Sequence, residues 1–371
     1  MDLDAALSFL TEADRLKSVE RANVLLDGAR PENSAEHSWH VALWGLVFGL
    51  SDRAIAMIVI HDLVEIDCGD HPIHLAFDPG LAAREAAAAA RIFGILPDGA
   101  GLLALWQEFE AGVSPDARAA RRMDHVQPVF QVLLSPAPLP AHIGIVRDNM
   151  AVGRAARLHE EWPEAMAAAG ALLEGGGVAP DWAGRLAFLA EADRLKSVLR
   201  ASRIQSGRRE NSAEHSWHLA LYALVLAPLA GAGVSIGRVI RMLILHDLVE
   251  IDTGDVPIHA DGGATHHGAA QMLAEARAAD RLFGLLPVPL GAELRALWDE
   301  FEGDATPDAV FAKSLDRAQP VMLNIAAGGG TWAEFGVTWE QLAGRVGSRI
   351  ARGSPALWDW LGSRARGYLQ G

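Results

Sequence analysis

The stretch ENSAEHSWH occupies residues 32–40, and the identical nine letters return at residues 210–218. Most core positions accept several apolar residues of similar volume, so packing alone seldom demands nine consecutive identities. Most of these letters are polar, and two of them are histidines. We therefore expect the string to do more than fill a core, and to do it twice in one chain.

Other segments repeat in the same order around this string. EADRLKSV stands at 12–19 and again at 191–198, and HDLVEID stands at 61–67 and again at 246–252. The offset between copies drifts from 179 (12 to 191) to 192 for the later pair QP (127 to 319). A drift of this kind indicates a few loop insertions and excludes a short-period solenoid.

The repeat divides the chain into two parts of ordinary domain size. We predict one domain at 1–178, with a divergent C-terminal part, and a second at 179–371. The seam falls in EGGGVAP (174–180), which is rich in glycine and ends in proline. The duplication also allows the two halves to pack as a pseudo-dimer.

The composition narrows the function classes. Half of the 371 residues are hydrophobic, and no run of 18 apolar residues predicts a membrane span. The net charge of −15 argues against a nucleic-acid polymer or an anionic membrane as partner. The N-terminus has acids where a signal peptide needs bases, and Cys68 is the only cysteine, so we expect a cytoplasmic protein.

The periodicity predicts an all-α fold. Apolar residues recur at helical spacing from Ala35 onward, and Asn33 with Glu36 fits a capping box that Asn211 with Glu214 repeats. No stretch shows a convincing alternation of apolar and polar residues, so we expect no sheet.

The stretch AIAMIVIHDLVEID (54–67) reads as one buried helix that ends near Cys68–Gly69. Five ionisable groups lie in and just after its last turns: His61, Asp62, Glu65, Asp67 and Asp70. Burying such a cluster is costly unless a bound cation compensates; the alternative is a helix cap and a solvated helix end. The second copy has the same spacing with His246, Asp247, Glu250, Asp252 and Asp255, which favours the cation. Histidine with carboxylate suits Mn, Fe, Co, Ni or Zn.

Two further positions complete a candidate ligand set in each half. His37, one turn into the helix of the nine-letter string, is a plausible third ligand beside the His-Asp pair, although a lone buried histidine is more often a core residue. Asp124 occupies the same place in the first half as Asp316 in the second.

This order of His, His-Asp and a distant Asp resembles the HD-domain metal-dependent phosphohydrolases, twice over. The patterns E-N-x-x-E-H and H-D-x-x-E look most like the branch that contains bacterial and eukaryotic 5′-deoxynucleotidases. The resemblance covers about residues 8–130 and 187–325. It implies two tandem HD-domain helical bundles, each with one divalent metal ion (Mn, Co, Fe, Ni, Zn or Mg).

The resemblance also implies a role for individual residues. The implied metal ligands are His37, His61, Asp62 and Asp124 in the first half, and His215, His246, Asp247 and Asp316 in the second. The implied catalytic acids near the attacked phosphate are Glu65, Asp70, Glu250 and Asp255. The implied phosphate-binding residues are Arg21 and Arg200, with Lys17 and Lys196 as weaker candidates.

The expected reaction is removal of phosphate from a small phosphate monoester, a nucleoside 5′-monophosphate, by metal-activated water. Two alternatives stay open. One is an oxygenase of the mixed-valent di-iron HD type, and the other is a non-catalytic nucleotide-binding or sensing module.

The two copies differ after the last aspartate. The second has a Gly-rich segment at 328–330 and Trp332, whereas the first has SPAPLP at 135–140. The second also has His266 and His267, which either supply a second metal or belong to a Gly-rich loop. We expect the second half to be the more typical catalyst.

Overall fold

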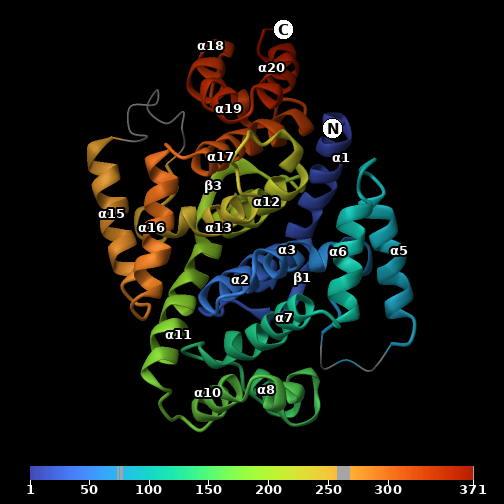
Figure 1. Cartoon of the computed structure of the whole chain (residues 1–371), viewed down its shortest axis with the longest axis vertical. Coiled ribbons are helices and arrows are strands. Elements are labelled where there is room, and N and C mark those ends of the chain that lie inside the picture. The colour runs from blue at the N-terminus through green and yellow to red at the C-terminus, as the bar shows by residue number, and fades with distance from the viewer. Residues whose placement is uncertain (73–74, 76–77, 257–267, 371) are drawn as a thin grey trace.

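The computed structural model describes the whole chain except residues 73–74, 76–77, 257–267 and 371. Helices make up most of the described chain, so the all-α prediction is confirmed (Figure 1). None of the described helices combines the length and the apolar character needed to cross a bilayer.

The helices follow the same order in the two sequence halves. The first half contains α1 (Leu3–Asp14), α2 (Ser34–Val47), α3 (Asp52–Ile60), α4 (Glu65–Cys68), α5 (Leu81–Phe93), α6 (Ala100–Ala111), α7 (Pro115–Leu133), α8 (Pro140–Val152), α9 (Leu158–Glu161) and α10 (Pro163–Leu173). The second contains α11 (Pro180–Ala192), α12 (Ser212–Val225), α13 (Ile236–Leu245), α14 (Glu250–Thr253), α15 (Ala269–Phe283), α16 (Leu290–Gly303), α17 (Pro307–Ala326), α18 (Trp339–Leu342), α19 (Ser348–Gly353) and α20 (Pro355–Leu369).

Short tight turns link these helices. They are η1 (Arg15–Ser18), η2 (His61–Val64), η3 (Arg154–Arg157), η4 (Asp193–Ser197), η5 (Ala227–Leu229), η6 (His246–Val249), η8 (Gly330–Trp332) and the π-helical turn η9 (Ala343–Gly347). Between α10 and α11, residues 174–179 form no helix, and the predicted seam lies there.

Two small antiparallel strand pairs were not expected. They are β1 (Glu20–Val24) with β2 (Pro31–Asn33), and β3 (Leu199–Arg203) with β4 (Arg209–Asn211). Both pairs shift register, and β1 shows no clean alternation of buried and exposed positions. The period-two pattern that marks a strand is therefore absent from the sequence.

The two nine-letter helices begin as the sequence predicts. The Asn33 side chain accepts from the backbone N–H of Glu36, and the Glu36 carboxylate accepts from the backbone N–H of Asn33. Asn211 and Glu214 form the same capping box at the start of α12. Every residue of α2 is buried. Burying the polar side chains at its start is costly unless they have hydrogen-bond partners.

The helix predicted at 54–67 is wrong in one respect. The α-helical pattern stops at Ile60, and residues His61–Val64 form a 3₁₀ turn before α4. His61 Nδ1 lies 2.7 Å from the Ile58 carbonyl, and Trp106 Nε1 donates to the His61 carbonyl at 3.1 Å. The carbonyls of Ile58 and His61 are therefore bound by side chains, whereas in an uninterrupted helix they would accept backbone N–H groups four residues later. The predicted end at Cys68–Gly69 holds, since Gly69 has φ 71°.

The two halves meet along their nine-letter helices. In Figure 1, α2 and α3 lie beside α12 and α13 at the centre of the molecule, and contacts join all four. The first helix of each half reaches across: α1 contacts α12, and α11 contacts α2. The core is therefore continuous between the halves.

Hydrogen bonds between the halves occur in matched pairs. Asn33 Nδ2 donates to Glu214 Oε1 at 2.6 Å. Asn211 Nδ2 donates to Glu36 Oε1 at 2.7 Å. Each capping asparagine therefore also binds the capping glutamate of the other half.

The tryptophan and the second histidine of each nine-residue string also contact the opposite half in matched pairs. Trp39 Nε1 donates to the Ile244 carbonyl at 3.0 Å, and Trp217 Nε1 to the Val59 carbonyl at 2.9 Å. The ring nitrogens His40 Nε2 and His218 Nε2 lie 3.1 and 3.0 Å from carbonyls of α11 and α1, respectively. These contacts account for much of the identity of the two strings.

We predict that Asn211→Asp destabilises the protein more than Asn211→Ala. Aspartate caps a helix as well as asparagine does, but here its carboxylate would face that of Glu36. We expect a loss of about 2 kcal/mol for alanine and about 3 kcal/mol or more for aspartate, because an unpaired charge is buried. Denaturant unfolding measures both.

Thr338→Ala is the matched control, because it removes a capping box at α18, whose cap residues are exposed. It should cost about 1 kcal/mol. If Asn211→Asp unfolds like the wild type, the side chain acts only as a cap and the bond between the halves contributes nothing.

Candidate metal centres

The four predicted ligands of the first half converge from three helical segments. His37 comes from α2, His61 and Asp62 from the turn after α3, and Asp124 from α7. His37 Nε2 lies 3.2 Å from Asp124 Oδ1, and His61 Nε2 lies 3.2 Å from Asp62 Oδ1. Donor atoms of His37, His61 and Asp124 all lie within 4.8 Å of one another, which is close enough to share one ion.

The orientation of the imidazoles fits a cation. His61 Nδ1 faces the Ile58 carbonyl, so Nδ1 carries the proton and Nε2 presents its lone pair. Within the described residues, His61 Nε2 is buried and has no hydrogen-bond partner. A buried nitrogen lone pair among carboxylates is what a divalent ion would satisfy.

The second half builds the same arrangement. His215 Nε2 lies 3.2 Å from Asp316 Oδ1, and His246 Nε2 lies 3.0 Å from Asp247 Oδ1. His246 Nδ1 is 2.8 Å from the Leu243 carbonyl, and its Nε2 also lacks a hydrogen-bond partner in the described chain. Donor atoms of His215, His246 and Asp247 lie within 4.8 Å of one another.

The predicted arginine and acids lie next to each quartet. Arg21 Nη1 approaches Asp62 Oδ2 at 3.0 Å, Glu65 Oε1 at 3.3 Å and Asp70 Oδ1 at 3.4 Å. The β1–β2 pair positions this arginine, since the Ala22 N–H donates to Asp70 Oδ2 at 3.3 Å.

The second half repeats this group. Arg200 Nη1 lies 2.6 Å from Asp247 Oδ2, 3.3 Å from Glu250 Oε1 and 3.5 Å from Asp255 Oδ1. Ser212 Oγ donates to Glu250 Oε2 at 2.5 Å. In both halves, therefore, one arginine and two further carboxylates lie beside the quartet, whose His-Asp aspartate also contacts the arginine.

The surroundings of Glu65 and Glu250 raise the pKa of each side chain. Burial raises the pKa of Glu65 to about 8, and the neighbouring carboxylate of Asp62 adds to the effect while Arg21 opposes it. Burial likewise raises the pKa of Glu250 well above its ordinary value, with Asp247 contributing next. A carboxyl group with a raised pKa suits general acid–base work near neutral pH.

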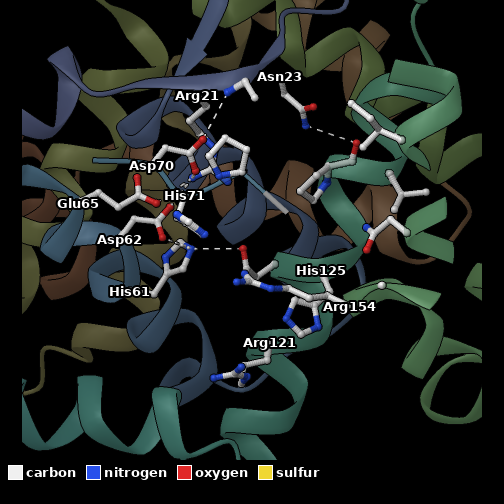
Figure 2. Close-up of a pocket in the computed structure, with 18 of the residues that line it drawn as sticks. Arg21, Asn23, His61, Asp62, Glu65, Asp70, His71, Arg121, His125 and Arg154 are labelled. Atoms are coloured by element: carbon white, nitrogen blue, oxygen red, sulfur yellow. Dashed lines mark hydrogen bonds and ion pairs between the residues drawn. The ribbon is translucent and has the colours of Figure 1, made fainter. Parts of the chain in front are cut away.

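A cavity opens onto each quartet. The first has a volume of about 590 Å³, and Arg121, His125 and Arg154 line the side opposite the acids. Figure 2 shows Asp62, Glu65 and Asp70 gathered near Arg21, across the cavity from this basic group.

The second cavity is smaller over the described residues, at about 160 Å³. Trp332, Phe335 and Val337 form part of its wall. The glycines of 328–330 all have positive φ, and a Cβ on Gly330 would lie 2.3 Å from Asn324 Oδ1. Glycine is therefore required in the turn that delivers Trp332.

Lys17 and Lys196 lie elsewhere, contrary to the idea that they bind phosphate. Neither lines either of these two cavities, and both are buried between the halves. Lys17 Nζ lies 2.6 Å from Asp14, 2.6 Å from Glu210 and 2.9 Å from His218 Nδ1. The resemblance implied a weaker phosphate-binding role for both lysines, and sequence spacing does not reveal a contact between distant segments.

Two residues that sequence reasoning did not single out lie directly behind the ligand histidines. Glu32 Oε2 lies 3.7 Å from His37 Nδ1, and Glu210 Oε2 lies 3.4 Å from His215 Nδ1. Each is the first letter of the repeated string, which was the available signal. Arg154 in the first cavity had no such signal, because it lies in the part of the first half where the two sequences diverge.

His266 and His267 lie outside the described residues. The described chain contains two other clusters with metal-type donors, Asp14 with Glu210 and His218, and Glu32 with His40 and Asp193. A lysine ammonium already sits in each of them.

Comparison with known proteins identifies the family. A family model described as HD domain matches residues 13–166 and 192–358, which is more than half of the chain. The chain therefore belongs to the HD-domain family, and the resemblance stated from the motifs is confirmed.

Several curated relatives are named 5′-deoxynucleotidases. HDDC2 from Mus musculus is 29% identical over 142 residues, or 38% of this chain and 68% of that protein. HDDC2 from Homo sapiens is 28% identical over 37% of this chain and 65% of that protein. The enzyme plu3092 from Photorhabdus laumondii is 29% identical over 35% of this chain and 67% of that protein.

The chain thus spans about two thirds of the length of these relatives. A crystal structure of a "predicted metal-dependent phosphohydrolase" from Magnetospirillum magnetotacticum is 45% identical, covering 52% of this chain and 99% of that one, with a TM-score of 0.47. The family match and the relatives' names support a hydrolytic HD-domain enzyme.

Proposed function

We propose that this HD-domain protein removes phosphate from a nucleoside 5′-monophosphate, with one active site in each half. The observation that carries the proposal is the duplicated quartet. In each, His61 or His246 presents a buried Nε2 toward carboxylates, and this atom has no hydrogen-bond partner among the described residues. The names of the curated relatives support this substrate class.

Each half is proposed to hold one divalent ion. The ligands are His37, His61, Asp62 and Asp124 in the first half and His215, His246, Asp247 and Asp316 in the second. An ion at such a site supplies two things when bound: it lowers the pKa of water and it polarises a phosphoryl oxygen.

The remaining polar residues of each site act on water and phosphate. Glu65 lies beside Asp62, and burial raises its pKa to about 8, so it can orient the attacking water and exchange a proton with it. Arg21 approaches the same acids and is placed to neutralise a phosphoryl oxygen. Asp70 contacts the arginine and fixes its direction.

The second site repeats these roles with Glu250, Arg200 and Asp255. Trp332 and Phe335 give this cavity aromatic surface on which a base can stack.

We propose that residues 1–178 and 179–371 are two domains arranged as a pseudo-dimer. The reciprocal bonds from Asn33 and Asn211 support this, because a two-fold interface pairs residue i with j and j with i. A cytoplasmic location is also proposed, since a chain with Cys68 as its only cysteine suits a reducing compartment.

Both quartets should bind metal. Elemental analysis after reconstitution with Mn²⁺ or Co²⁺ should approach about two ions per chain, one for each set of ligands. His61→Ala and His246→Ala should each lower the content to about one, because each removes a ligand from one site only. His159→Ala, which changes an exposed histidine, is the control.

The prediction of two metal sites would be contradicted if the wild type held one ion per chain, if His246→Ala abolished it and if His61→Ala left it unchanged. The first quartet would then not be a metal site.

Glu65 and Glu250 should affect turnover more than metal content. Changing both to glutamine keeps their size and removes the group that handles the proton, so we expect kcat to fall roughly a hundredfold or more. Hydrolysis of a nucleoside monophosphate, measured with metal content on the same samples, tests this. Unchanged turnover in the double variant would exclude both residues from the reaction, and Glu293→Gln on the exposed face of α16 controls for the loss of a carboxylate.

The two sites should prefer different substrates. The first cavity has His142, Asn149 and Arg154 where the second has Trp332 and Phe335, and a different wall alters transition-state contacts.

We expect the Asp62→Ala protein, in which only the second site works, to retain most activity on a nucleoside monophosphate. Asp247→Ala should leave a slower enzyme with another substrate ranking. A panel of phosphate monoesters assayed on both variants measures this. Equal halves of the activity with one ranking would show that the sites are equivalent.

A further inference from the structure

One buried carboxylate lies behind the α2 or α12 histidine of each quartet. Glu32 Oε2 and His37 Nδ1 are 3.7 Å apart, and Glu210 Oε2 and His215 Nδ1 are 3.4 Å apart. All four residues are 0% exposed. None of these four atoms has a hydrogen-bond partner among the described residues.

Each glutamate therefore lies where a metal-binding histidine normally has its orienting carboxylate. A histidine that binds metal through Nε2 normally donates its Nδ1–H to a carboxylate or carbonyl, which fixes the ring and its tautomer. His61 and His246 meet that need with carbonyls of their own helices. Among the described residues, no carbonyl faces Nδ1 of His37 or His215 in the same way; the carboxylates of Glu32 and Glu210 lie there instead, at 3.7 and 3.4 Å, just beyond hydrogen-bond contact.

The other half holds each of these glutamates in place. Lys196 Nζ, from the turn after α11, lies 2.7 Å from Glu32 Oε1. Lys17 Nζ, from the turn after α1, lies 2.6 Å from Glu210 Oε1. Each lysine therefore binds the outer oxygen of a carboxylate whose inner oxygen faces a ligand histidine of the opposite half.

The lysines are fixed in turn by their own half. Lys196 contacts Asp193, three residues earlier in its turn, and Lys17 Nζ lies 2.6 Å from Asp14 in the same relation. A buried carboxylate is stable only with a partner of this kind. Without Lys196, the charged groups that still act on Glu32 are His37 and Arg21. In the second half, Gln319 Nε2 also donates to Glu210 Oε1 at 2.8 Å, so Glu210 keeps one partner when Lys17 is lost.

We propose that Lys17 and Lys196 are positioning residues that act across the two halves. Lys196 supports the first metal centre through Glu32 and His37, and Lys17 supports the second through Glu210 and His215. Each centre is then complete only when the opposite half is docked. This rests on the proposed function in one respect: the quartets are taken to be metal sites.

A positioning role for the lysines differs from a purely structural role in which metal site is weakened when a lysine is lost. Lys196 belongs to the second half of the sequence, yet its loss should weaken metal binding in the first. A general loss of stability would affect both sites alike or follow the half that carries the change.

The test isolates one site at a time in the full chain. His246→Ala leaves the first quartet and His61→Ala leaves the second. Lys196→Met is added to each background, and the affinity for Mn²⁺ or Co²⁺ is measured by competition titration. We expect the first quartet to lose roughly ten- to a hundredfold in affinity, as outer-shell partners of metal ligands do, and the second to change by less than about threefold. Lys17→Met should give the reverse pattern.

Two further variants keep the result interpretable. Lys196→Arg retains the cation and should restore most of the first site's affinity. Glu32→Gln leaves the lysine in place and should weaken the same site alone, which provides a measurement if Lys196→Met does not fold. Far-ultraviolet circular dichroism and denaturant unfolding check that every protein measured is folded.

The outcomes separate the two proposals. If Lys196→Met and Glu32→Gln leave the first site's affinity unchanged, or weaken both sites equally, the positioning role is wrong while the metal sites stand. If His61→Ala or His246→Ala removes no metal from the otherwise unchanged protein, the proposed metal sites themselves are wrong.

Discussion

The reciprocal contact between α2 and α12 is the constraint on which the rest of the structure depends. These helices are almost entirely buried although they begin with acids, an asparagine and histidines. Buried polar groups need partners, and many of these partners come from the other half. The Glu36 carboxylate accepts a hydrogen bond from the side-chain amide of Asn211, and the Trp39 indole donates one to the Ile244 carbonyl. Neither helix could be buried in this way without its counterpart.

The same helices deliver one metal-type ligand each, so the contact and the chemistry are coupled. His37 points one ring nitrogen at Asp124 and the other at Glu32, which a lysine of the opposite half binds. A change anywhere along this chain of contacts alters both the fit of the halves and the shape of the site. This coupling explains why the nine letters are identical, whereas the cavity walls, which need only suit a substrate, have diverged.

Much of this could be predicted from the sequence because it depends on local rules. The helical spacing and the repeated order of motifs predicted that His61, Asp62 and Asp124 share one site. The structure places their side chains together. The capping boxes followed from three-residue spacing.

What could not be predicted depends on contacts between distant segments. The short strand pairs lack an alternating pattern, and the 3₁₀ turn after α3 arises because the His61 side chain takes the Ile58 carbonyl. The burial of Lys17 and Lys196 could not be predicted for the same reason, since it depends on contacts with the opposite half. The most direct measurement of the central claim is anomalous diffraction from Mn²⁺-loaded crystals. The account predicts one peak at each quartet, about 2.0–2.3 Å from the Nε2 atoms of its two histidines, with Glu32 and Glu210 hydrogen-bonded behind them. A peak at only one quartet, or peaks that displace the lysines from their acidic clusters, would contradict it.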